Sequence, residues 1–242
     1  MIFDIHAHYG QWLSTSIPDT PERFSALLDR FRIDNVIVSS GRAIQYDICS
    51  GNAEVADLVT RDKRIYGAVV VNPNQLDESL DDMERHSSNK RFIAVKHHPD
   101  YSGTAVDSPL MEPVLDYTAE LGLPLFVHTW GESQINSACA VAKKYPELTL
   151  FLFHMGGDAW RLAVERAVEY PNVNLEFISS IPDPERIRVA VETLGPERVF
   201  FGTDMTLISP AVAIGLMKGA RLSEADAQRV FSLNAKEFFH ID

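Results

Sequence analysis

Six side chains that can bind a metal ion or carry a proton stand at the ends of apolar runs in this sequence. They are His6, His8, Lys96, His128, His154 and Asp204. Alternate residues of a strand point to one side, so His6 and His8 would share a face, about 6.6 Å apart at ~3.3 Å per residue. Two imidazoles on one face can bind one ion, at about 2.0–2.1 Å from each nitrogen. If the other runs end at the same rim, the six groups converge on one site, and the pattern indicates an enzyme.

Short β-rich runs alternate with longer helical stretches along the whole chain. Strands are predicted at residues 2–6, 35–39, 65–71, 92–96, 123–128, 148–154, 173–177 and 198–202. Several of these runs are almost continuously apolar, which is typical of parallel strands that helices cover on both faces. Helices are predicted to begin at Pro21, capped by Thr20, and to cover residues 54–60, 76–86, 109–121, 136–145, 159–170, 184–194 and 224–239.

Eight strands alternating with eight helices predict an α/β fold, the (β/α)8 TIM barrel, as a single domain over residues 1–242. A doubly wound open sheet is the alternative. It is less favoured, because no Gly-x-Gly-x-x-Gly motif follows the first strand. In such a barrel the active site lies at the carboxyl ends of the strands, where the six candidate side chains stand.

The composition limits the partners. The net charge is −12, from 22 basic and 34 acidic residues, which argues against nucleic acid or an anionic membrane and favours a small-molecule substrate. Only two cysteines occur, Cys49 and Cys139, so a disulfide framework is not expected. No apolar run is long enough to cross a membrane, and the first residues do not resemble a signal peptide. We therefore expect a cytoplasmic protein.

Each candidate has a simpler structural interpretation when it is taken alone. A single histidine at a strand end is more often a hydrogen-bonded structural residue than a metal ligand, Lys96 alone would be a solvated rim residue, and Asp204 could be a turn residue. All six would have to fall at strand ends independently, however, and their common position makes chance a poor explanation.

Six stretches of the chain carry a resemblance to a known family. They are residues 3–8, 95–99, 124–129, 153–157, 200–204 and 234–239. In this order they are similar to the amidohydrolase superfamily, and within it to the amidohydrolase-related branch of metal-dependent hydrolases and decarboxylases. The resemblance implies that His6, His8, His128 and Asp204 bind one divalent ion, with zinc as the expected metal. His154 would lie beside the ion or be a further ligand.

The resemblance leaves the role of Lys96 open. In binuclear relatives a lysine at this position is carboxylated and bridges two metals, so that Lys96 would be a ligand. In the single-metal branch an unmodified Lys96 would face the pocket and bind a substrate carboxylate or an oxyanion. We favour one zinc ion over two, while another divalent metal stays open.

The expected chemistry is hydrolysis of an amide, lactone or related bond in a small substrate, with a carboxylate as a weaker expectation. Zinc would lower the pKa of a bound water, Asp204 would carry its proton to the leaving group, and His154 would orient the carbonyl or act as acid or base. The loops look short for a decarboxylase, which favours hydrolysis. Metal-dependent decarboxylation is the alternative, and a non-enzymatic binding barrel is the third interpretation.

Loop residues are predicted to choose the substrate. Arg42 could clamp an anion, and Trp130 and Tyr101 could stack on a ring, although each could equally pack a loop onto the rim. A homodimer is a further hypothesis, because Leu216 and Met217 could form an apolar outer surface, although packing in the core explains these residues equally well.

Overall fold

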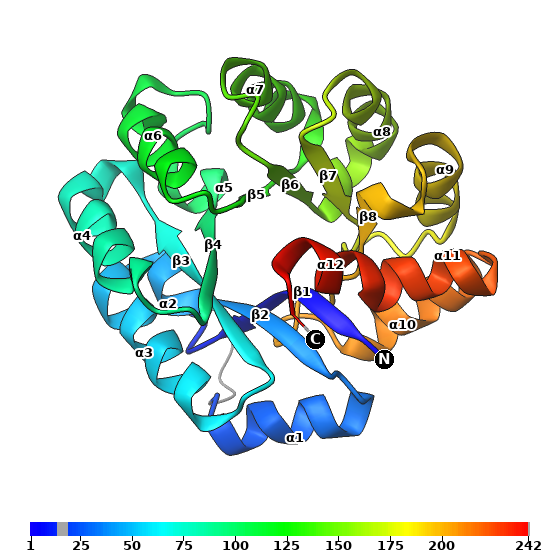
Figure 1. Ribbon diagram of the computed structural model, residues 1–242, viewed down its shortest axis with the longest axis horizontal. Helices are drawn as coiled ribbons and strands as arrows, with labels where there is room; N and C mark the ends of the chain where they lie inside the picture. Colours follow the sequence, from blue (N-terminus) through cyan, green and yellow to red (C-terminus); the bar gives the residue numbers. More distant parts are fainter. Residues whose placement is uncertain (14–18, 242) are drawn as a thin grey trace.

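Parallel strands form a barrel at the centre of the molecule (Figure 1). The computed structural model describes residues 1–13 and 19–241, and within these residues eight strands pair in sequence order from β1 to β8. The strands are β1 (Phe3–Tyr9), β2 (Asn35–Ser40), β3 (Ile65–Val71), β4 (Phe92–His97), β5 (Leu125–His128), β6 (Leu150–Phe153), β7 (Val173–Glu176) and β8 (Val199–Phe200). The predicted (β/α)8 TIM barrel is confirmed.

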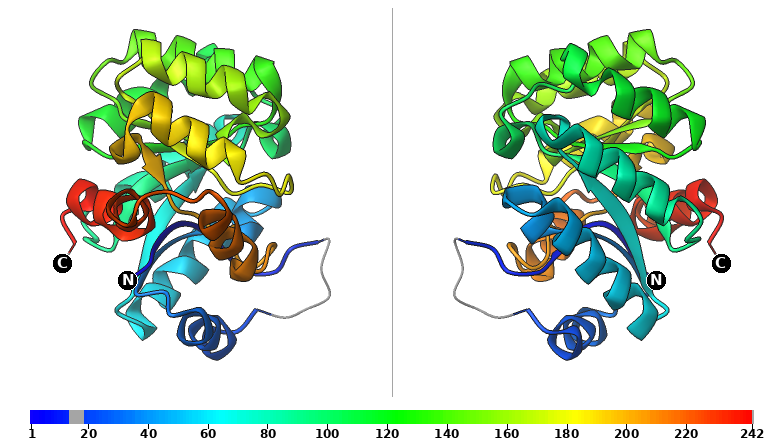
Figure 2. Two further views of the ribbon diagram at one scale, coloured as in Figure 1. Left: turned by 90° about the vertical axis from the view of Figure 1, so that its right-hand side faces the viewer. Right: turned by 90° about the vertical axis from the view of Figure 1, so that its left-hand side faces the viewer.

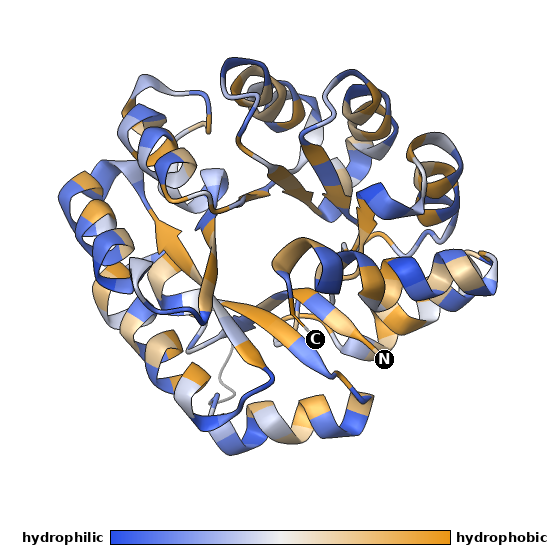
Figure 3. Ribbon diagram, in the orientation of Figure 1, coloured by the Kyte–Doolittle hydropathy of each residue, from blue (hydrophilic) through white to orange (hydrophobic). Residues whose placement is uncertain are grey.

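Helices surround the strands (Figure 1), and hydrophilic residues alternate with hydrophobic ones along these helices (Figure 3). The α-helices are α1 (Pro21–Phe31), α2 (Gly41–Gln45), α3 (Ile48–Arg61), α4 (Leu76–Ser87), α5 (Pro99–Ser102), α6 (Glu112–Glu120), α7 (Gly131–Lys144), α8 (Trp160–Glu169), α9 (Glu185–Leu194), α10 (Pro210–Gly219), α11 (Glu224–Gln228) and α12 (Asn234–Phe239). Short turns of other helix types are η1 (Pro73–Gln75), η2 (Pro109–Met111), η3 (His154–Ala159), η4 (Pro196–Arg198) and the π-type η5 (Arg229–Leu233). The predicted cap at Thr20 is present, because its side chain accepts a hydrogen bond from the backbone N–H of Arg23.

Three helices are absent from the prediction, for two physical reasons. Helices α2 and α5 have five and four residues, too few to show a helical period. Helix α10 is apolar on most of its faces and shows no clear amphipathic stripe. Leu216 and Met217 on α10 are 7% and 3% exposed and pack in the core, which is the alternative that the sequence left open for them. A homodimer stays a prediction.

The barrel closes between β1 and the segment that follows β8. The backbone N–H of Ile5 donates to the carbonyl of Phe201 at 3.0 Å, and the N–H of Asp204 donates to the carbonyl of His6 at 2.7 Å. The buried Asp4 carboxylate strengthens this seam, because it accepts hydrogen bonds from the backbone N–H and the hydroxyl of Thr203. The closure sets Asp204 directly beside the histidines of β1.

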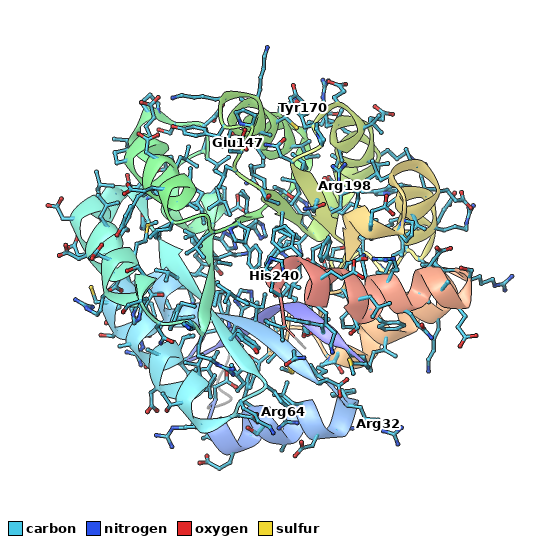
Figure 4. All side chains as sticks on the ribbon, in the orientation of Figure 1. Arg32, Arg64, Glu147, Tyr170, Arg198 and His240 are labelled. Atoms are coloured by element: carbon cyan, nitrogen blue, oxygen red, sulfur yellow. The ribbon has the colours of Figure 1, made fainter. Side chains whose placement is uncertain are left out.

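Side chains fill the inside of the barrel, so the centre is a packed core rather than a pore (Figure 4). Helix α12 lies across one end, the end that also carries both termini (Figure 2). Its Phe238 and Phe239 pack against the interior side chains of this end. The interior cluster consists of Phe3, Ile5, Ile37, Ala68, Ala94, Phe126, Phe151, Phe153, Phe200 and Ala235. The opposite end, at the carboxyl ends of the strands, therefore remains for a site. In the described part of the chain no helix has the length and hydropathy to cross a bilayer.

An ion-pair network joins α1, the end of α3 and the start of β3, and it gives a test of the fold. Arg64, labelled beside α1 in Figure 4, contacts Asp29 and Asp62 at 2.6 Å each. The hydrogen bonds from Arg64 lower the pKa of Asp62 to about 2. We expect Asp62→Asn to lower the free energy of unfolding by about 1–2 kcal/mol at pH 7, measured by urea denaturation.

The pH dependence of this effect has a definite sign. The folded pKa of Asp62 lies below its ordinary value of 3.8, so its stabilisation is complete above pH 5 and is lost as the pH falls from about 4 towards 2. The difference between Asp62→Asn and wild type should therefore shrink between pH 5 and pH 3. The control is Asp57→Asn, which removes an exposed pair with Arg61 and should change stability by less than about 0.5 kcal/mol. A pH-independent loss in the Asp62 variant would contradict this account.

Candidate metal centre

A cavity of about 400 Å³ opens at the carboxyl ends of the strands. Its walls combine imidazoles, carboxylates and aromatic rings, contributed by His8, Trp12, His98, Asp100, Tyr101, His128, His154, Asp204 and Leu207. Among the described lining residues there is neither a lysine nor an arginine. A substrate anion that enters this cavity would therefore meet no lysine or arginine among these residues, and a bound metal ion would supply positive charge.

His6, His8 and Asp204 form a group that can hold a metal ion. Each offers one ligand atom, and these atoms all lie within 4.8 Å of one another. The Nε2 atom of His8 is 3.1 Å from Oδ1 of Asp204, and the Nε2 atom of His6 is 3.6 Å from the same oxygen. Strand β1 runs on to Tyr9, so both histidines lie within the strand, and its alternation turns them to one side as predicted.

Hydrogen bonds at Nδ1 orient the imidazole rings of His6, His8 and His154. Nδ1 of His8 lies 3.0 Å from the hydroxyl of Ser39, at the end of β2. Nδ1 of His6 lies 2.8 Å from Oε2 of Glu176, the last residue of β7. Nδ1 of His154 lies 2.7 Å from the carbonyl oxygen of Ile178 and must donate to it, which leaves Nε2 of that ring without a proton when the ring is neutral.

Two candidate residues have left-handed backbone conformations. His154 has φ 65° and Asp204 has φ 54°. Residues other than glycine rarely adopt this region, and where they do the cost is held by the surrounding structure, often at functional sites. Here the turns after β6 and β8 bring both side chains to the mouth of the barrel.

Burial and neighbouring charges set the protonation of the group. Burial and the charge of Lys96 hold the pKa of His6 well below its ordinary value, and burial lowers the pKa of His154 to about 4. Burial alone would raise the pKa of Asp204, but the hydrogen bond and charge of His8 reverse this and lower it. At neutral pH the imidazoles of His6 and His154 are neutral and Asp204 is a carboxylate, which are the forms that bind a metal.

The residues present fit a divalent ion. The Nε2 atom of His6 is buried and has no hydrogen-bond partner among the described residues. A buried nitrogen with a free lone pair, beside a second imidazole and a carboxylate, is a combination that zinc and other first-row divalent metals accept.

His128 does not join the group of His6, His8 and Asp204 in this structure. Its Nε2 atom lies 3.0 Å from Oδ2 of Asp100, and its ring stacks on His98 with the centroids 3.9 Å apart. These three residues form a second group whose ligand atoms lie within 4.8 Å of one another. The predicted set of four ligands is thus divided between two groups, and the role of His128 as a ligand stays a prediction.

Lys96 is not among the residues that line the cavity. Its side chain is fully buried, and Nζ sits 4.0 Å from the centroid of the Phe153 ring without a hydrogen-bond partner among the described residues. Burial lowers the pKa of Lys96 to about 7. An unmodified Lys96 is expected to face the pocket, whereas in this structure its side chain is buried outside the cavity lining. A role as a carboxylated, bridging ligand stays a prediction.

The predicted substrate-binding residues lie at different depths. Tyr101 lines the cavity, with its ring 6.0 Å from that of Trp12. Trp130 is outside the lining and sits 6.1 Å from the His154 ring. Arg42 is also outside the lining, because its guanidinium pairs with Glu54 at 2.7 Å. Among the predicted three, only Tyr101 is in direct reach of a ligand in the cavity.

Glu176 is missing from the residues that the sequence predicts for the site. It is fully buried, and burial raises its pKa well above the ordinary value. The signal that could have found it is its position, because Glu176 is an acidic residue at the end of a barrel strand, as His128 is an imidazole at the end of β5. Ser39 is the second-last residue of β2 and is equally absent from the prediction.

The family model described as amidohydrolase matches residues 3–241, nearly the whole chain. The chain belongs to the amidohydrolase family. This family assignment agrees with the resemblance seen in the sequence motifs and makes the protein a member of an enzyme family. No curated protein matches the sequence significantly.

Several solved structures are similar to this fold. A 2,6-dihydroxybenzoate decarboxylase from Rhizobium has 16% identity and a TM-score of 0.77, with 100% of both chains covered. A dihydroxybenzoic acid decarboxylase from a Polaromonas species, with bound manganese and the inhibitor 2-nitroresorcinol, has 18% identity and a TM-score of 0.77, covering 100% of this chain and 98% of that one. A 4-oxalomesaconate hydratase from Rhodopseudomonas palustris has 16% identity and a TM-score of 0.73, covering 100% and 96%. At these identities the likeness establishes the fold alone.

Proposed function

We propose that this amidohydrolase-family protein is a metal-dependent decarboxylase of a small planar carboxylic acid of the hydroxybenzoate type. The observation that supports this proposal is the small cavity at the carboxyl ends of the strands. Aromatic rings and imidazoles form its walls, and its described lining contains no lysine or arginine. A ring of benzoate size fits about 400 Å³, and Trp12 and Tyr101 offer faces against which it can stack. The names of the two decarboxylases support the same class of substrate.

The metal would be held by His6, His8 and Asp204, with His128 as the predicted fourth ligand. When bound, a divalent ion supplies positive charge that attracts the substrate carboxylate and stabilises negative charge on the ring oxygen. The donor set of imidazole and carboxylate suits zinc and also manganese, the metal bound to the Polaromonas enzyme. Zinc therefore stays one of two candidate metals.

Asp204 is the proposed proton carrier. As a carboxylate at neutral pH, it takes the proton of the ring hydroxyl and delivers it to the ring carbon that bears the substrate carboxylate. The bond from that carbon to the carboxylate carbon then breaks, CO2 leaves, and the bonding electrons return to the ring, whose oxygen regains a proton from solvent. His154, fixed through Nδ1, presents Nε2 as an acceptor that can orient the ring hydroxyl.

Metal removal and restoration test this proposal. We expect purified protein treated with a chelator to lose at least 95% of its CO2 release from 2,6-dihydroxybenzoate or a related hydroxybenzoate, and to regain it with Mn²⁺ or Zn²⁺, because positive charge in the cavity must come from the ion. CO2 and the phenol product are measured together. Release of CO2 that is indifferent to chelation would contradict the metal dependence.

Hydrolysis of an amide or lactone is the second candidate. It is favoured by the Asp204 carboxylate beside His8, because a carboxylate 3.1 Å from an imidazole in a metal group could equally accept a proton from an attacking water. The two functions are separated by offering both substrate classes to the same preparation. Hydrolysis of a lactone or amide, without CO2 release from any hydroxybenzoate, would replace the decarboxylase proposal.

A further inference from the structure

We infer that Glu176 is a positioning residue that keeps His6 in the tautomer able to bind a divalent ion. The inference rests on the metal centre of the proposed function and is independent of which bond the enzyme breaks. Glu176 is fully buried at the end of β7 and touches β1 through His6 and the turn after β6 through His154. It therefore links three neighbouring parts of the barrel at the rim.

All described hydrogen-bond partners of Glu176 are nitrogens. Oε2 faces Nδ1 of His6 at 2.8 Å and accepts from the backbone N–H of His154 at 3.2 Å, while Oε1 accepts from the backbone N–H of Ile178. The two backbone groups can only donate. A carboxylate that accepts from all three satisfies each partner, and it requires the proton of the His6 ring to sit on Nδ1.

The opposite nitrogen of His6 agrees with this assignment. Nε2 is buried, has no hydrogen-bond partner among the described residues and is 3.6 Å from the nearest Asp204 oxygen. A proton on that nitrogen would leave a buried donor unpaired, which costs about 1–3 kcal/mol. A bare Nε2 instead presents a lone pair on the side of His8 and Asp204, where an ion would bind.

Two neighbouring residues act on the carboxyl group of Glu176 and limit its movement. Arg186 of α9 is 1% exposed, donates to the carbonyl of His154 at 2.6 Å, and its positive charge interacts with Glu176. Gly202 leaves the room that the carboxylate needs, because a Cβ at this position would lie 2.6 Å from Cδ of Glu176 and 2.7 Å from Cβ of His6. The packing thus leaves the carboxyl group little freedom to turn away from His6.

Glu176→Gln is the informative substitution, because it keeps length and shape but has a single acceptor oxygen. If that oxygen faces His6, the amide NH2 meets the N–H of Ile178, and if the amide turns, the NH2 meets Nδ1 of His6. We expect affinity for Zn²⁺ or Mn²⁺, measured by competition with a chromophoric chelator, to fall about 10–100-fold. The matched control is Asp82→Asn, which alters an equally buried carboxylate held by Asn52 and Arg85 and should lower stability without changing metal affinity.

A second measurement needs no variant. In metal-free wild type, nitrogen-15 correlation spectra of the histidine rings should show the His6 proton on Nδ1, and Glu176→Gln should add signal from the Nε2-protonated form. A proton on Nε2 in wild type, or equal metal affinity in wild type and Glu176→Gln, would overturn the inference alone. Failure of wild type to bind either ion would overturn the metal centre of the proposed function together with it.

Discussion

The double substitution His6→Ala/His8→Ala is expected to abolish metal binding and to lower turnover at least about 10³-fold. It removes two of the three ligand atoms that lie within 4.8 Å of one another, and the remaining carboxylate of Asp204 cannot hold a divalent ion alone. An ion that stabilises transition-state charge contributes several kcal/mol, and each 1.36 kcal/mol is a factor of ten in rate. Metal content per chain by inductively coupled plasma mass spectrometry, and CO2 release, are the two measurements.

A histidine outside the cavity provides the control for this prediction. His86 on α4 is 7% exposed and stacks on Phe92 with the ring centroids 4.3 Å apart, away from the metal group. His86→Ala should lower stability but keep the wild-type metal content. We expect about one ion per wild-type chain. About two ions would instead favour a carboxylated Lys96 that bridges a pair, and an unchanged metal content in the double variant would place the ion elsewhere.

The order of the strands was predictable because it depends on local patterns. Continuous apolar runs such as Leu150–Phe153 report burial on both faces, and the alternation of β1 fixes the shared direction of His6 and His8 without any knowledge of the fold. Once the strands close in sequence order, groups at their carboxyl ends must gather at one rim. The barrel and the approximate place of the site therefore follow from the sequence.

Which rim residues face each other was not predictable, because it depends on side-chain directions in three dimensions. Asp100 lies on α5, the short helix that follows β4, and its carboxylate contacts His128. Arg42 pairs with Glu54 of α3 and does not line the cavity. The sequence also gives no measure of depth, so Lys96 reads as a rim residue although Phe153 covers its ammonium group. Glu176 illustrates the same limit, since an acidic residue at a strand end is more often solvated than buried.

Asp204→Asn is expected to lower kcat at least about 10³-fold while the ion remains bound, which separates proton transfer from metal binding. Asparagine keeps the size of the side chain and one oxygen that can contact an ion, but it cannot take up and release a proton at neutral pH. Asp204 lies 3.1 Å from Nε2 of His8 and has a left-handed backbone conformation. Another acid–base group is therefore not expected to take over its proton transfer in the variant. The measurements are kcat, KM and metal content on one preparation.

The comparison with Asp100→Asn makes this result specific. Asp100 is a carboxylate of the same cavity but belongs to the second group, with His98 and His128, and its side chain is 52% exposed. If Asp204 is the proton carrier, Asp204→Asn should lose far more kcat than Asp100→Asn, with a KM that changes less than about tenfold. Activity within about tenfold of wild type in Asp204→Asn, with full metal content, would assign the proton to another group. His154 would then be the next candidate, because Nε2 of its ring is free to accept a proton.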